Sequence, residues 1–314
     1  MSQASADAIF EVLSRHYVNV GMTIINDLAD LEALVAAGPD LVFLGMQFIS
    51  TPQRVWLSDY FDEYDIAYTG SPQTAHELER NKPLAKQRVL DAGLKTAAYC
   101  VINQDQLATQ SDIQLAFPLF IKPTNKGGGL GVSSDSVARN FTQLQSKAQS
   151  ISTTFRTDSL IEEYLPGREF SVAILKDESS GYYLSMPIEL IAPSDANGDR
   201  LLSGPVKASN AEQALPVTDR IMKSAVADLA LAVFHALGAR DYGRIDIRLD
   251  TAGTPHFLEA NLIPSLIDGY GSFPKACALN GGLQYEQMIL SITNLGLSSG
   301  LREVEATLEP ALRT

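Results

Sequence analysis

Gly243-Arg244-Ile245-Asp246-Ile247-Arg248-Leu249 and, one short turn later, His256-Phe257-Leu258-Glu259-Ala260-Asn261 are the stretches that decide the fold. Apolar and charged residues alternate strictly in the first run, which is the pattern of a β-strand with one buried face. The second run alternates in the same way. Between them, Asp250-Thr251-Ala252-Gly253-Thr254-Pro255 has the composition of a hairpin turn. The two runs therefore predict an antiparallel hairpin.

The hairpin predicts two opposed carboxylates. If Asp250 faces Pro255 across the turn, Asp246 lies opposite Glu259 on the neighbouring strand. Side chains in such positions lie within about 5.5 Å, where two carboxylates repel each other and each favours a proton. We therefore expect a positive group between them.

A hard divalent cation fits the oxygen-rich face of this hairpin. Mg²⁺ takes a few protein oxygens and leaves its other positions for phosphate and water. Arg244 on the same face would add a fixed positive charge. The alternative is a solvated face on which arginines neutralise the acids, but the apolar run Leu258–Ser265 around the polar pair favours a buried site. The predicted metal ligands are Asp246, Glu259 and Asn261.

A glycine-rich loop precedes the hairpin in the chain. Lys122 ends an expected strand, and Lys126-Gly127-Gly128-Gly129-Leu130-Gly131 follows within a few residues. Such a loop can present backbone N–H groups to phosphates, with a nearby lysine as countercharge. It is not a P-loop, because no helix-initiating Gly-Lys-Ser/Thr follows a strand at that spacing. A flexible hairpin tip is the alternative interpretation.

The remaining pattern predicts an α/β (α+β) chain with no repeats. The alternation of expected strands and helices at the start of the chain is typical of a parallel sheet. A polar segment extends from Pro193 to Gln213. The expected helices cover Ala6–Arg15, Leu28–Ala37, a segment from Thr74 that ends at Gly93, and a long helix from Thr218 or Asp219 to the cap at Gly238. The expected strands cover Val18–Ile25, Asp40–Gly45, Ala97–Ile102, Phe117–Lys122, Leu160–Leu165 and Phe170–Leu175.

Composition excludes several classes of protein. The chain has 314 residues, 45% of them hydrophobic, and 24 Lys+Arg against 37 Asp+Glu give a net charge of -13. This charge argues against nucleic acid or an anionic membrane as partner. The first residues lack a signal-peptide pattern and no apolar run reaches the length of a membrane span, so we expect a cytoplasmic location. Cys100 and Cys277 have no partners at disulfide or zinc spacing.

Five motifs in a fixed order resemble those of D-alanine–D-alanine ligases, which are members of the ATP-grasp family. The resemblance covers roughly residues 65 to 295, and the set is specific although each motif alone is weak. The motifs are Asn81-Lys82; Ile121-Lys122-Pro123 with the glycine loop; Leu160 to Phe170 (LIEEYLPGREF); Gly243 to Asp246; and Leu258 to Asn261.

The resemblance implies three domains, with nucleotide between the central and C-terminal ones. We place them at residues 1–73, 74–165 and 166–314. The residues implied to bind ATP are Lys82, Lys122 and Lys207 at the phosphates, Gly127, Gly128 and Gly129 in a lid, Glu162, Glu163 and Leu165 at the adenine, and Glu169 at the ribose. The implied metals are two Mg²⁺ ions, for which Mn²⁺ could substitute, and Arg244 would stabilise a tetrahedral intermediate.

The implied activity is formation of an amide or peptide bond through an acyl phosphate, with release of ADP. Small-molecule carboxylates and amines, in particular amino acids, are the expected partners, and a homodimer is compatible with the sequence. The alternative from another class is a degenerate ATP-grasp protein that binds nucleotide as a regulatory module.

The sequence departs from the family at its substrate positions. An N-terminal glycine-rich turn and a His-Gly segment bearing a glutamate are not recognisable. Gly128 stands where the family has a serine, Ala208 where it has a tyrosine, and Ser265 where it has a glycine. Tyr270 is a candidate specificity residue. We therefore expect a substrate pair other than D-alanine.

Overall fold

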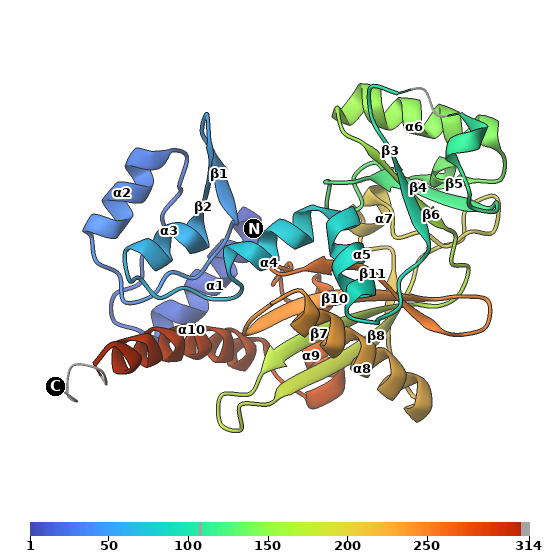
Figure 1. The fold of residues 1–314 in the computed structure, drawn as a ribbon. Coiled ribbons are helices and arrows are strands. Elements are labelled where there is room, and N and C mark those ends of the chain that lie inside the picture. Colours follow the sequence, from blue (N-terminus) through green and yellow to red (C-terminus); the bar gives the residue numbers. More distant parts are fainter. Residues whose placement is uncertain (107–108, 309–314) are drawn as a thin grey trace.

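A computed structural model describes residues 1–106 and 109–308 of the chain. A four-stranded sheet lies above a five-stranded sheet on the right of Figure 1, and a smaller region of helices with a two-stranded hairpin lies on the left. Residues 107–108 and 309–314, which belong to the second and third predicted domains, lie outside the described part. Among the helices within it, none combines the length and apolar character needed to cross a membrane. The domain boundaries stay a prediction.

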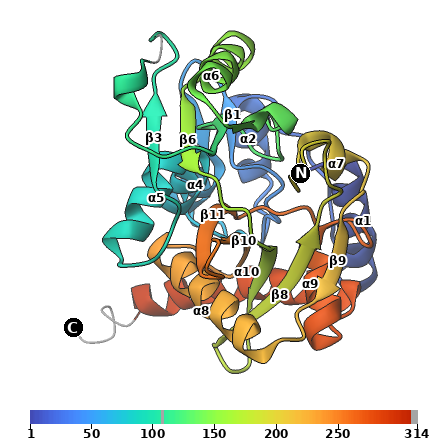
Figure 2. The same cartoon turned by 90° about the vertical axis from the view of Figure 1, so that its right-hand side faces the viewer.

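The five-stranded sheet is antiparallel and carries the predicted hairpin. Its order is β11-β10-β7-β8-β9. One face packs against α8 (Arg220–Ala236), and the other packs against α1 (Gln3–His16), α9 (Ser272–Gly281) and α10 (Tyr285–Leu308), as the turned view of Figure 2 also shows. The strands are β7 (Glu169–Lys176), β8 (Tyr183–Ile191), β9 (Gln213–Pro216), β10 (Tyr242–Leu249) and β11 (Pro255–Asn261).

The predicted hairpin is confirmed, but its turn register differs from the expected one. Pro255 pairs with Leu249 rather than Asp250. Continued regularly, that register would bring Leu258 opposite Asp246. A register shift between Asp246 and Ile247 inserts one extra residue in β11, so that Glu259 lies opposite Asp246 after all. Such a β-bulge re-aims side chains next to functional sites, and here it turns the Glu259 carboxylate towards the polar face of β10.

The four-stranded sheet has the order β3-β6-β4-β5, with antiparallel neighbours. Helix α6 (Phe141–Phe155) covers it, and Leu144 and Ile151 pack against Leu119, Ile121 and Ile161 in a separate hydrophobic core. Two short 3-10 helices, η1 (Gln110–Asp112) and η2 (Ser134–Ser136), lie in its loops. Its strands are β3 (Tyr99–Ile102), β4 (Leu119–Pro123), β5 (Val137–Ala138) and β6 (Ser159–Glu163).

The single helix expected from Thr74 to Gly93 is wrong, because the chain forms two helices there. They are α4 (Gln73–Arg80) and α5 (Lys82–Asp91), and they meet at Asn81. The Asn81 side chain accepts a hydrogen bond from Leu84 N–H and so caps α5. Pro83 favours a new helix start, since it has no N–H to continue the previous one. The break places Lys82 at the first position of α5.

The parallel sheet expected near the N-terminus is also wrong. Val18–Ile25 forms no strand in the described structure, and Val18 and Ile24 are 98% and 69% exposed. Within Asp40–Gly45, Val42 makes only an isolated parallel bridge to Tyr68. Apolar runs become strands only where a neighbouring strand satisfies their backbone groups. The region contains instead α1 (Gln3–His16), α2 (Leu28–Ala36), α3 (Leu57–Glu63) and the hairpin of β1 (Phe48–Ser50) and β2 (Arg54–Trp56).

Three elements around the polar segment were not predicted from the sequence. Strand β8 was not predicted because Pro187 interrupts its pattern, and a proline argues against a central strand. Pairing between β8 and β9 begins only at Ile188, so Pro187 lies where β8 has a free edge. The segment from Pro193 to Gln213 also contains the short helix α7 (Gly204–Ala208). The long helix is confirmed as α8, with Asp219 as its N-terminal cap.

Candidate active site

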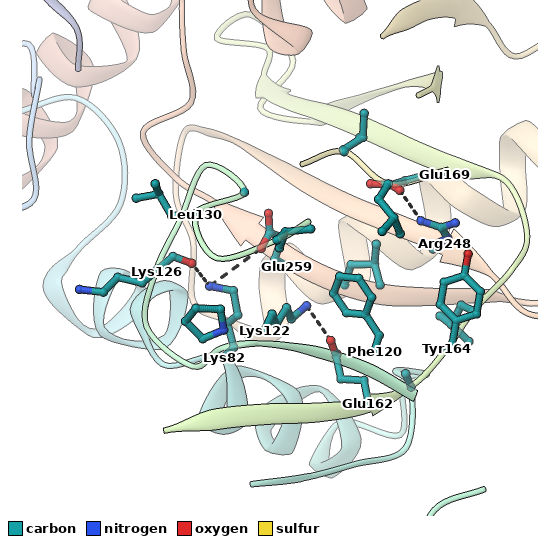
Figure 3. A pocket seen from close by; sticks show the side chains of 18 of the residues that line it. Lys82, Phe120, Lys122, Lys126, Leu130, Glu162, Tyr164, Glu169, Arg248 and Glu259 are labelled. Atoms are coloured by element: carbon teal, nitrogen blue, oxygen red, sulfur yellow. Dashed lines mark hydrogen bonds and ion pairs between the residues drawn. The ribbon is translucent and has the colours of Figure 1, made fainter. Parts of the chain in front are cut away.

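A pocket of the described structure lies between the two sheets. Figure 3 shows Glu162 and Lys122 on one side and Glu169 and Arg248 on the other. The open space within it, together with the part that opens to solvent, is about 730 Å³. Of the residues predicted for the site, those that line the pocket are Lys82, Lys122, Gly129, Glu162, Glu163, Leu165, Glu169, Lys207 and Glu259.

A buried row of three charges lies at one wall of the pocket, and two of them, Glu162 and Lys122, line it. Glu162 on β6 contacts Lys86 Nζ at 2.5 Å and Lys122 Nζ at 2.7 Å, and all three side chains are less than a tenth exposed. Burial alone would raise the pKa of Glu162, but Lys122 and Lys86 outweigh it and hold the pKa below its usual value. At Lys86, in contrast, burial outweighs the attraction of Glu162 and lowers the pKa. Glu162 is therefore a shared counterion of two lysines.

Lys82 connects the glycine loop to the hairpin face that carries Asp246, Glu259 and Asn261. Its Nζ donates a hydrogen bond to the carbonyl of Lys126 and lies 3.9 Å from Glu259 Oε2. Figure 3 shows both interactions converging on the ammonium group. Burial lowers the pKa of Lys82, opposed in part by Glu259. The helix start at Asn81 thus delivers a buried cation to the pocket.

The register of β10 and β11 gathers the predicted metal ligands. Asp246 lies opposite Glu259, and Arg244 lies opposite Asn261. Arg244 donates from Nε and Nη2 to the two oxygens of Asp246 at 2.9 and 2.8 Å, and Ser171 Oγ donates to Oδ1 at 2.8 Å. Arg244 therefore offsets much of the repulsion expected between the two carboxylates.

Glu259 remains ionised on this face. Burial would raise its pKa, but Lys82, Lys207, Lys122 and Arg244 together lower it to about 2. Within the described residues, no three His, Cys, Asp or Glu side chains converge as a metal site. Two carboxylates and one amide instead fit an ion that takes its other ligands from phosphate and water, which is the habit of Mg²⁺.

The glycine loop closes against α7. Gly129 lines the pocket, and its carbonyl accepts a hydrogen bond from Gly204 N–H at 3.2 Å. A Cβ on Gly129 would lie 2.7 Å from Gly204 N, so only glycine allows this approach. Gly127 and Gly128 belong to the same loop but do not line the pocket. The contact brings the loop beside the helix that carries Lys207.

The other end of the pocket combines apolar and polar groups. Leu165 and Leu202 line it, and Glu169 contacts Arg248 Nη1 at 2.8 Å. Burial raises the pKa of Glu169 although Arg248 opposes the shift. The exposed residue Glu163 also lines the pocket. This end suits a flat, mostly apolar group with a few polar edges.

Sequence reasoning missed four polar residues of the site. Lys86 looks like a helix surface charge until the packing of α5 buries it. Ser272 starts α9 and accepts a hydrogen bond from Arg244 Nη1 at 3.2 Å, which no local pattern could reveal. The other two are Ser171 and Arg248, for which alternation along β7 and β10 was the available signal.

The fold defines the class of protein. The crystal structure of D-alanine–D-alanine ligase from Bacillus anthracis superimposes with a TM-score of 0.76 at 20% identity, covering 96% of this chain and 93% of that chain. The structure of the same ligase complexed with ATP gives a TM-score of 0.73 at 20% identity, with 96% and 94% covered. The chain has the ATP-grasp fold.

Sequence comparison identifies the family. A family model described as D-ala D-ala ligase C-terminus matches residues 89–294. The D-alanine–D-alanine ligase of Bordetella petrii is 30% identical over 266 residues, which are 84% of this chain and 78% of that protein. An uncharacterized protein, y4sG, from Sinorhizobium fredii is 30% identical over 234 residues, 73% of this chain and 66% of that protein. The chain belongs to the D-alanine–D-alanine ligase family, as its motifs predicted.

The buried row yields a stability prediction. Glu162→Gln removes the counterion of Lys86 and Lys122, and breaking a buried ion pair in this way costs about 3 to 5 kcal/mol. Urea unfolding at neutral pH measures the loss. Glu163→Gln, at the neighbouring exposed position, is the matched control and should change stability by no more than about 0.5 kcal/mol. Equal stability of the two variants would contradict the assignment of Glu162 as a buried counterion.

Proposed function

We propose that this chain is an ATP-dependent carboxylate–amine ligase that works through an acyl phosphate. The observation that carries the proposal is that Lys82, Lys122 and Lys207 surround Glu259 at one end of a pocket whose other end combines leucine side chains with a few polar groups. A triphosphate needs such a cluster of cations, and a base needs such an apolar slot. The ATP complex of the B. anthracis ligase, which has the same fold, supports nucleotide as the ligand.

The arrangement suits phosphoryl transfer to a carboxylate. A carboxylate is a poor electrophile, so one of its oxygens first takes the terminal phosphoryl group of ATP, with ADP as the leaving group. Lys82 and Lys122 would hold the charged oxygens and stabilise the charge that spreads over them. The closed contact between Gly129 and Gly204 would keep water from the acyl phosphate.

The second step forms the amide bond. An amine attacks the carbonyl carbon, loses a proton, and inorganic phosphate leaves. Arg244 would stabilise the oxyanion of the tetrahedral intermediate, because its guanidinium is buried beside the polar face of β10 and stays protonated. Its bidentate pairing with Asp246 fixes the direction in which the remaining N–H groups point.

Glu259, Asn261 and Asp246 would hold Mg²⁺ in this scheme. When bound, the ion supplies charge neutralisation and Lewis acidity at the phosphate oxygens. The low pKa of Glu259 keeps its oxygens available at neutral pH.

The substrate pair should differ from two D-alanine molecules. Gly128 and Ala208 supply no side chain where the family resemblance implies a serine and a tyrosine. Tyr270 donates its hydroxyl hydrogen to the Lys207 carbonyl at 2.8 Å, so it lies beside α7 and would select substrates there.

A screen of ADP release tests the proposed function. Pairs drawn from the L-amino acids and a set of D-amino acids are offered with Mg²⁺ and ATP, and products are identified by mass spectrometry. We expect ADP and an amide product with at least one pair, and little ADP with D-alanine alone. Rapid D-alanyl-D-alanine formation would contradict the expected change of substrate. ATP binding without turnover by any pair would favour a regulatory nucleotide-binding module.

Glu259→Gln tests the metal face. The variant should lose nearly all turnover, because charge stabilisation of phosphoryl transfer is removed, while the protein stays folded. Thermal melting with and without Mg²⁺-ATP should show a smaller ligand-induced shift than in the parent. Glu63→Gln, an exposed position on α3, should behave like the parent. Unchanged turnover and an equal Mg²⁺-ATP shift would remove Glu259 from the site.

A further inference from the structure

One face of the N-terminal hairpin carries two aromatic rings and a guanidinium. In the register of β1 and β2, Phe48 lies opposite Trp56, and Arg54 lies two residues further along on the same face. The two rings meet edge-on, with centroids 5.2 Å apart. The guanidinium carbon of Arg54 lies 4.4 Å from the centroid of Phe48 and 5.4 Å from that of Trp56. The hairpin therefore holds one arginine against an aromatic platform.

Arg80 brings a second guanidinium to this platform. It ends α4 (Gln73–Arg80), and its guanidinium carbon lies 4.6 Å from the centroid of Phe48. In the part of the chain that the structure describes, neither arginine forms a hydrogen bond or an ion pair. Burial lowers the pKa of Arg80 and Arg54 lowers it further, while Glu79 opposes the shift. Two like charges thus share one aromatic ring with no carboxylate in contact.

An uncompensated pair of cations is costly in free energy. Arg80 loses hydration because it is partly buried, and Arg54 adds repulsion. The chain has 37 Asp+Glu against 24 Lys+Arg, so acids that could neutralise the pair are plentiful. Contact with the ring of Phe48 holds both guanidiniums in place, and no described residue accepts from their N–H groups. Planar N–H forks of this kind match the two oxygens of a carboxylate.

The platform of Phe48, Trp56, Arg54 and Arg80 lies next to the proposed reacting end of the site. Arg80 is two residues before Lys82. The charge of Glu79, the residue before Arg80, reaches both Lys82 and Arg244. In Figure 1 the hairpin of β1 and β2 and the four-stranded sheet rise on the same side of α4 and α5. The four platform residues do not line the pocket between the sheets, so the platform borders that pocket from outside.

We propose that Arg54 and Arg80 bind a substrate carboxylate other than the one that ATP activates. This inference rests on the proposed ligase function and narrows its substrate class to acidic amino acids. A carboxylate bound by the two guanidiniums would supply the missing counterion, and charged hydrogen bonds of this kind are about twice as strong as neutral ones. A neutral amide of the same shape would leave both cations uncompensated. The platform should therefore discriminate an acidic amino acid from its amide.

Trp56 gives the platform a direct readout. It is the only tryptophan of the chain and lies against Arg54, so a ligand on the arginines should alter its fluorescence. The L- and D-forms of aspartate and glutamate are titrated at constant ionic strength, alone and with Mg²⁺-ADP. Asparagine, glutamine and inorganic phosphate serve as comparisons. We expect a saturable change with at least one acidic amino acid and little change with its amide.

Substitution of the arginines tests their role. Arg54→Gln and Arg80→Gln should each weaken binding of that acidic amino acid by about 10- to 100-fold, because a charged hydrogen-bonding fork is lost. Arg80→Lys keeps the charge without the planar fork and should retain part of the affinity. Arg220→Gln, at an exposed position that starts α8, is the matched control and should bind like the parent.

Three outcomes overturn the inference. They are no response of Trp56 to any acidic amino acid, an equal response to inorganic phosphate, and unchanged binding in both arginine-to-glutamine variants. The ADP-release assay separates these outcomes from a failure of the proposed function. Arg80→Gln should lower kcat/KM for the acidic amino acid and leave the KM for ATP unchanged. Turnover of neutral amino acids alone would contradict the inference and leave the ligase function standing. A response of Trp56 without ADP release by any pair would support the arginine site and contradict the ligase function.

Discussion

Compensation of buried charge is the constraint on which the site depends. Lys82, Lys86 and Lys122 are each less than a tenth exposed in the cleft between the sheets. A buried ammonium group is costly unless a carboxylate meets it with good geometry. Glu162 and Glu259 provide that compensation, and each comes from a different sheet. These ion pairs therefore link the two sheets, and they involve the same lysines that we propose to bind phosphates.

Two local irregularities of the backbone bring Lys82 and Glu259 together. The helix break at Asn81 starts α5 at Lys82 and directs that lysine into the cleft. The β-bulge in β11 rotates Glu259 to the face of Asp246. Both are small departures from regular secondary structure, of the kind that proteins keep where side chains must be aimed. Regular elements at either place would leave the lysine-rich end of the pocket without its charge balance.

Sequence reasoning reached the hairpin, the long helix and the set of charged motifs because alternation, caps and motif order are local signals. It predicted correctly that Asp246 lies opposite Glu259, but it derived this from a wrong turn register. The β-bulge that corrects the register leaves no clear mark in the pattern of residues. Lys86 could not be found in this way. Its environment is created by packing between elements far apart in the chain, and periodicity carries no information about it. The strand predicted at Val18–Ile25 is wrong for the same reason, because a strand needs a neighbouring strand and a local stretch of sequence does not show whether one is present.

The central claim is that the lysine-rich end of the pocket binds the phosphates of ATP together with Mg²⁺. Isothermal titration of the folded protein with ATP, in the presence and absence of Mg²⁺, tests it most directly. The account predicts saturable binding that strengthens with Mg²⁺ and weakens markedly for AMP, which lacks the phosphates that Lys82 and Lys122 would hold. Absence of any heat of ATP binding at saturating Mg²⁺, from protein shown to be folded, would contradict it.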